Sequence, residues 1–189
     1  MNNEKIVPFM NLDLAVLSLL AVLSETLSSG LLEIWNSGFY FSFSTAICLI
    51  AMIRWGAWGI LPGMAGGIPA MAFSNMTVFG GCLYYVFANI FLAVPILLFG
   101  KRNRNQIAGH GLFLLAYVFL SHLCLAAGKG IAIFLIAGET TGAVDYFGAA
   151  FLILFIDMLV CLVLKTRKGL ICDMRYYFTG GEGNEEYGG

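Results

Sequence analysis

RWGAWGILPGMAGGIP, residues 54–69, is the stretch of this chain that decides the fold. Five glycines and two prolines fall within it: Gly56, Gly59, Gly63, Gly66, Gly67, Pro62 and Pro69. In water this stretch would be a poor helix, because a helical glycine costs about 1 kcal/mol and a proline about 3 kcal/mol relative to alanine. In a membrane, the regular spacing of Gly59, Gly63 and Gly67 makes a smooth strip for close helix contact. We therefore expect a helical bundle packed around this strip.

The composition places the chain in a membrane. Of its 189 residues, 60% are hydrophobic and 11% are charged, and the mean hydropathy is +0.87. Soluble domains typically carry about 25% charged residues. A soluble fold of this size could not bury so much apolar surface, so we predict an all-α integral membrane protein. The net charge of −1 and the lack of a basic arm give no indication of a nucleic-acid partner.

Six apolar segments can be drawn along the chain, at residues 12–32, 39–53, 55–73, 76–99, 111–137 and 143–164. Crossing about 30 Å of hydrocarbon takes about 20 helical residues, so most of these segments are long enough. The second segment is short, and only Arg54 divides it from the third. Four or five spans therefore remain open, but six is the favoured number.

The cations favour six spans with both termini in the cytoplasm. In that topology nine of the ten cations lie on one side: Lys5, Arg54, Lys101, Arg102, Arg104, Lys165, Arg167, Lys168 and Arg175. Lys129 is the tenth and lies inside the fifth segment. Positive charge collects on the cytoplasmic side of membrane proteins. We thus expect a multi-pass protein of the plasma membrane, with Trp55 and Trp58 as anchors at its cytoplasmic interface.

The chain is expected to form a single domain over residues 1–178, with a basic, aromatic juxtamembrane segment at 165–178. Residues 179–189 are rich in glycine and glutamate, which predicts a disordered tail. The five cysteines are scattered and show no metal-ligand spacing. No catalytic motif is recognisable, so we expect neither an enzyme nor a cofactor or metal.

Two helices carry polar residues at matching depths. At about 1.5 Å per residue, Glu25 and His122 lie roughly 20 and 17 Å from the inner ends of their helices, and Glu33 and Lys129 roughly 31 and 27 Å. This predicts two pairs, Glu25 with His122 and Glu33 with Lys129. One interpretation is a binding cavity in the outer half, which would also use Asn89 and nearby aromatics. The other is a structural ion pair, with Lys129 reaching the outer interface.

Asp157 lies on the sixth segment, deeper than a rim residue. A charged group at this depth is costly and usually faces the interior of a bundle. We expect a structural role, with Ser18 or Asn89 as the partner of Asp157; a proton path is the alternative.

The whole chain resembles the substrate-capture (S) component of an energy-coupling-factor (ECF) vitamin transporter. The most specific likeness is the third segment, where WGAWG runs into ILPGMAGGIPA, similar to the family's G-x-x-x-G-x-x-G-G stretch. The resemblance implies a subunit that captures a vitamin-like small molecule from outside. It also implies partners, a transmembrane scaffold subunit and two cytoplasmic ATPases, which release the molecule inward.

The family's site lies in the outer half of the bundle. Carried onto this chain, the resemblance implies these candidate ligands: Glu33, Trp35, Asn36, Tyr84, Tyr85, Lys129, Asp145 and Tyr146. The aromatic residues suggest a ring-bearing solute and Lys129 a negative group on it. The glycine strip would then be a packing surface and a hinge beside the site. The alternative function is a six-helix sensor or assembly module whose segment 165–178 contacts a cytoplasmic partner.

Overall fold

The structure of the chain is a computed structural model that describes residues 3–34, 42–167 and 169–178. This part of the chain is helical, and the described residues contain no strand. Trp35, Asn36 and the tail 179–189, on which predictions were made, lie outside the described residues.

The long helices correspond to the predicted segments, with some breaks. In chain order the elements are α1 (Asn3–Ile34), α2 (Ser44–Trp55), the 3₁₀ turn η1 (Gly56–Gly59), α3 (Ile60–Phe73), α4 (Val78–Gly81), the π-helical turn η2 (Cys82–Val86), the 3₁₀ segment η3 (Phe87–Leu92), α5 (Ala93–Gly109), α6 (Gly111–Ala137), α7 (Gly142–Ala149), α8 (Phe151–Lys165) and α9 (Met174–Phe178). Only α6 keeps the bounds of its predicted segment.

Among the described residues, four helical stretches have the length and apolar composition to cross a membrane: Ile6–Gly30, Ser44–Phe73, Val78–Phe99 and Gly111–Ala137. A fifth is obtained if α7 and α8, which are bent by 53° at their junction, count as one span. The predicted membrane-protein class thus agrees with the helical structure.

The chain folds back on itself between α2 and α3. Gly56 ends α2 with φ at +69°, a left-handed conformation that glycine adopts without strain. A Cβ on Gly59 would lie 2.3 Å from the carbonyl carbon of Ala51, and one on Gly63 would lie 2.5 Å from Cys48 Sγ. A continuous helix separates residues eight apart by about 12 Å, so these contacts require α2 and α3 to run antiparallel.

The glycines of this stretch meet three different neighbouring elements at close range. Gly59 and Gly63 lie against α2, whereas a Cβ on Gly67 would reach the carbonyl oxygen of Tyr85 in η2. Gly66 faces Ser44 at the start of α2 and Ala21 of α1. The small residues therefore allow α3 to touch α1, α2 and η2 at once, and no larger side chain would fit.

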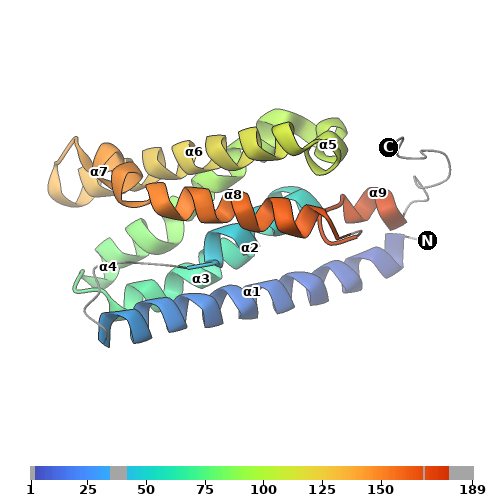
Figure 1. Cartoon of the computed structure of the whole chain (residues 1–189). Helices are drawn as coiled ribbons and strands as arrows, with labels where there is room; N and C mark the ends of the chain where they lie inside the picture. The colour runs from blue at the N-terminus through green and yellow to red at the C-terminus, as the bar shows by residue number, and fades with distance from the viewer. Residues whose placement is uncertain (1–2, 35–41, 168, 179–189) are drawn as a thin grey trace.

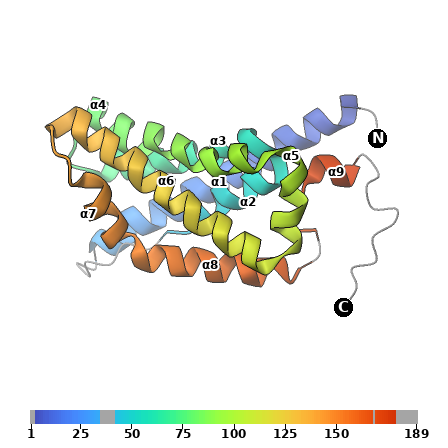
Figure 2. The same ribbon diagram turned by 90° about the horizontal axis from the view of Figure 1, so that it is seen from above.

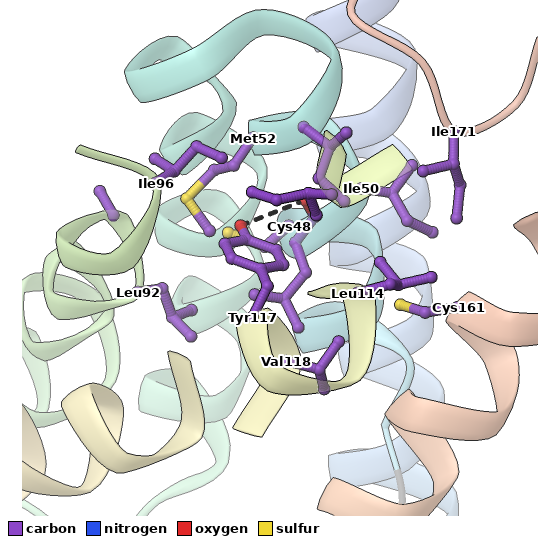
Figure 3. Close-up of a cluster of buried hydrophobic side chains, with 14 of the residues drawn as sticks. Cys48, Ile50, Met52, Leu92, Ile96, Leu114, Tyr117, Val118, Cys161 and Ile171 are labelled. Atoms are coloured by element: carbon purple, nitrogen blue, oxygen red, sulfur yellow. Dashed lines mark hydrogen bonds between the residues drawn. The ribbon is translucent and has the colours of Figure 1, made fainter. Parts of the chain in front are cut away.

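The main apolar core lies between α2, α5, α6 and α8. The Tyr117 ring from α6 is buried in it, and its hydroxyl donates to the Leu49 carbonyl at 3.5 Å (Figure 3). Ile171, from the segment after α8, packs on the same core. Residues 169–173 are thus part of the bundle.

One end of the bundle is held by ion pairs. Arg54 of α2 forms a two-point ion pair with Asp13 of α1, and its Nη1 donates to the carbonyls of Gly169 and Leu170. Arg104 of α5 pairs with Asp173 at 2.9 Å, and both side chains are buried. The start of α1 and α9 lie together at this end, opposite α7 (Figures 1 and 2).

The two tryptophans of residues 54–69, Trp55 and Trp58, have different environments. Trp58 is 56% exposed, as an interface anchor would be. Trp55 is only 1% exposed, and its indole N–H donates to Asp13. The expectation that Trp55 faces the interface is therefore wrong, because it packs with Ile6, Leu14 and Met174 inside the bundle.

Replacing Gly63 with leucine tests the close contact between α2 and α3. The new side chain would overlap Cys48 and Leu92, and overpacking of a core typically costs about 1–3 kcal/mol. We expect lower expression and a lower melting temperature in detergent. Gly148→Leu is the control, because a Cβ there meets nothing within 4 Å. Equal melting of the two variants would contradict the packing.

Candidate functional site

The ammonium of Lys129 lies within a group of three tyrosine rings. Its Nζ is 4.2 Å from the ring centroid of Tyr84, 5.0 Å from that of Tyr85 and 5.7 Å from that of Tyr146. It also donates a hydrogen bond to the backbone carbonyl of Tyr84. Only 5% of Lys129 is exposed. A cation over aromatic faces is stabilised by their quadrupoles, most strongly when it is desolvated.

An irregular backbone positions two of these tyrosines. Tyr84 and Tyr85 belong to the π-helical turn η2, which is followed directly by the 3₁₀ segment η3. Single π-helical turns often mark functional sites. Glycines hold this segment from two sides, since a Cβ on Gly67 would overlap the Tyr85 carbonyl and one on Gly128 would overlap Phe91. Gly128 directly precedes Lys129, so the same contact brings the lysine to the tyrosines.

Glu25 of α1 completes the cluster electrostatically. It is 4% exposed, it interacts with the charge of Lys129, and it accepts a hydrogen bond from the Ser42 hydroxyl at 2.5 Å. The Ser42 hydroxyl in turn accepts from the backbone N–H of Ser44, the first residue of α2. The Ser42 hydroxyl therefore links the first residue of α2 to the carboxylate of Glu25. We call Lys129, Glu25, Tyr84, Tyr85 and Tyr146 the lysine cluster.

The lysine cluster lies at the end of the bundle away from the ion pairs. Glu25 is twelve residues beyond Asp13 on α1, which corresponds to about 18 Å along the helix axis. Tyr146 comes from α7, which Figures 1 and 2 place at the end opposite α9. Four separate elements, α1, η2, α6 and α7, thus converge on one buried cation.

A second polar pair lies deeper. His122 Nε2 of α6 is 3.2 Å from Asp157 Oδ2 of α8, and the two side chains are 2% and 0% exposed. Nδ1 lies 3.1 Å from the Val118 carbonyl, which can only accept, so Nδ1 carries a proton. The two side chains are in close polar contact between α6 and α8, although the geometry at Nε2 and Oδ2 is not that of a hydrogen bond.

These partners correct the pairing expected from depth. His122 pairs with Asp157 and not with Glu25, and Asp157 contacts neither Ser18 nor Asn89 in a hydrogen bond of the described structure. The lysine interacts with Glu25, whereas the side chain of Glu33 lies outside the described part. The prediction from depth failed because it treated the helices as straight and parallel. Where helices cross, two side chains at equal depth need not be in contact.

The other predicted site residues lie apart from the lysine cluster. Asn89 donates to the Gly63 carbonyl at 2.6 Å and so joins η3 to α3. Asp145 is exposed at the start of α7. Ser42 was not predicted, and the local sequence does not mark it, because the N-cap position of α2 is occupied by Phe43. No group of three potential metal ligands occurs in the ranges that the structure covers.

Comparison of the chain with protein-family models, with curated proteins and with solved structures finds no match.

The buried His122–Asp157 pair can be tested by a double-mutant cycle. Asp157→Leu or His122→Phe alone leaves a buried polar group without its partner, and breaking such a pair typically costs about 3–5 kcal/mol. The double variant removes both groups, so we expect it to be more stable than either single variant. Unfolding in detergent measures this, with Leu159→Ala, at a residue that is 63% exposed, as control. Additive losses would contradict the pairing.

Proposed function

We infer that this chain is a membrane-embedded solute-binding subunit, working as the S component of an ECF-type transporter, with the lysine cluster as its binding site. The observation that carries this inference is the convergence of four elements on the buried ammonium of Lys129. A buried charge pair stabilises a fold no better than apolar packing does. Intramembrane ionisable groups are therefore functional candidates by default.

The chemistry of the lysine cluster suits a small solute with a ring. Tyrosine rings offer large apolar faces for stacking, while Lys129, Glu25 and the Ser42 hydroxyl provide polar contacts in fixed positions. Binding sites for small molecules typically combine such an apolar wall with a few converging polar groups. In this proposal the chain binds its solute and carries out no reaction.

In this proposal the chain crosses the membrane six times, with α2 and α3 as separate spans and α7 with α8 as one. The antiparallel course of α2 and α3 supports that number. The ion-paired end, with Arg54, Arg104 and Lys165, faces the cytoplasm, in agreement with the positive-inside rule. The scaffold subunit and the two ATPases would act from this side. Of the four long stretches, α1 is the least enclosed and leaves room for a scaffold beside it.

Reporter fusions test the topology. We expect a fluorescent protein fused after Gly189 to fluoresce, because it stays in the cytoplasm, and alkaline phosphatase fused after Thr140 to be active, because the loop between α6 and α7 is outside. An active phosphatase after Gly189 would place the C-terminus outside and contradict the proposal.

Solute binding is tested on the purified chain. We expect a small molecule to be retained through purification and detected by native mass spectrometry, and a member of a panel of ring-bearing vitamins to raise the melting temperature. Tyr84→Leu removes the ring nearest to Lys129, a contact of about 0.5–2 kcal/mol, so affinity should fall roughly 2- to 30-fold.

Phe79→Leu is the matched control, because Phe79 belongs to the same span and is 73% exposed. A chain that retains no molecule and responds to no member of the panel would rule out the binding function.

A further inference from the structure

The groups around the Lys129 ammonium decide which charge the site favours. The described groups that face it are three ring faces, the Tyr84 carbonyl and the carboxylate of Glu25. All of them are electron-rich. Aromatic faces attract ammonium groups, and sets of aromatic rings recognise cationic ligands.

These surroundings change the expectation for the solute. Lys129 taken alone suggests a negative group on the ligand. A carboxylate or phosphate entering the cluster, however, would meet the ring faces, the carbonyl and Glu25, each of which repels it. A positively charged group would find the environment that the lysine ammonium now has.

Charge balance limits how a cation can enter. Lys129 and Glu25 are 5% and 4% exposed. With Lys129 as an ammonium ion and Glu25 as a carboxylate, which is the starting state of the exchange proposed below, the lysine cluster is neutral as a whole. A second cation would leave one positive charge uncompensated in a site with little water, which is strongly unfavourable. Neutrality returns if Lys129 loses a proton, and a buried lysine is the residue that does this most readily.

We propose that the lysine cluster takes up a small organic ammonium ion in exchange for one proton from Lys129. This assignment rests on the proposed solute-binding function and names the chemical class of the solute. The ligand enters as R–NH₃⁺, the N–H bond of the Lys129 ammonium breaks, and the proton passes to water. Lys129 remains as a neutral amine, while the ligand ammonium takes the position over the rings. The net charge of the cluster does not change.

Lys129 is the group in the cluster that can supply this proton. The titratable groups facing it are Glu25 from α1, Tyr84 and Tyr85 from η2, and Tyr146 from α7. Loss of a proton from a tyrosine would create a new negative charge beside Glu25. Glu25, as a carboxylate, has no proton to give.

The probe is benzylammonium, which joins a ring to a primary ammonium. Benzyl alcohol and benzoate are the control ligands, because they carry the same ring with a neutral and a negatively charged group. Calorimetry on the full-length chain, in buffers of low and high ionisation enthalpy, counts the protons released on binding. We expect benzylammonium to bind more tightly than either control ligand, and its binding to release about one proton from the protein. Its apparent affinity should then rise nearly ten-fold per pH unit while Lys129 is protonated in the free protein.

Two variants separate the roles of the charges. Lys129→Met should still bind benzylammonium, with no proton release and no dependence of affinity on pH, because the exchanging group is gone. Glu25→Gln should lose most of the affinity, because the counter-charge is gone. Lys165→Met, at the end of α8, is the control and should behave as the unaltered chain.

The outcomes distinguish this inference from the function on which it rests. Preference for benzoate, or binding of benzylammonium without proton release by the unaltered chain, would overturn the exchange. If benzylammonium fails to bind while a ring-bearing vitamin does, the binding function stands and the cation assignment falls. If neither binds, both fall. The calorimetry on the unaltered chain decides these points even if Lys129→Met does not fold.

Discussion

Close approach of neighbouring elements at the glycines of α3 is the constraint on which the rest of this structure depends. Gly63 lets α2 lie against α3 at a distance that excludes even a methyl group, and Gly67 does the same for the Tyr85 carbonyl. Helices in lipid gain little from burying apolar side chains against one another, so close packing takes over that role. The position of the tyrosines, and hence of the whole lysine cluster, follows from this contact.

Polar groups divide the bundle into three levels with different tasks. At one end, Arg54 and Arg104 hold the chain segment after α8 to the bundle. In the interior, His122 of α6 lies 3.2 Å from Asp157 of α8. At the other end, Lys129 is surrounded by aromatic rings and has no carboxylate bound to it among the ion pairs of the described residues. The first two levels join helices directly, whereas the third gathers three aromatic rings around one lysine.

The sequence predicted the helical membrane-protein class well, but it predicted the side-chain contacts inside the bundle less well. The apolar segments predicted the helices, because hydrophobic length is a direct requirement of the bilayer. The glycine spacing indicated which face of α3 is close to its neighbours. The Lys129 and Tyr84 positions were both recognised as site candidates, yet their contact depends on a π-helical turn that no residue pattern in 82–86 announces. The partners of His122 and Glu25 could not be found from depth alone, because the crossing of helices is set by packing across the whole bundle.

The membrane stretch Val78–Phe99 contains two consecutive departures from regular α-helix. The π-helical turn η2 is wound more loosely than an α-helix, and the 3₁₀ segment η3 after it is wound more tightly. The two deviations are opposite in sense and partly cancel, so α4 and α5 remain close to the register of one continuous helix. Tyr84 and Tyr85 both belong to the loosened turn, so the angle between their side chains about the helix axis differs from that in a regular α-helix.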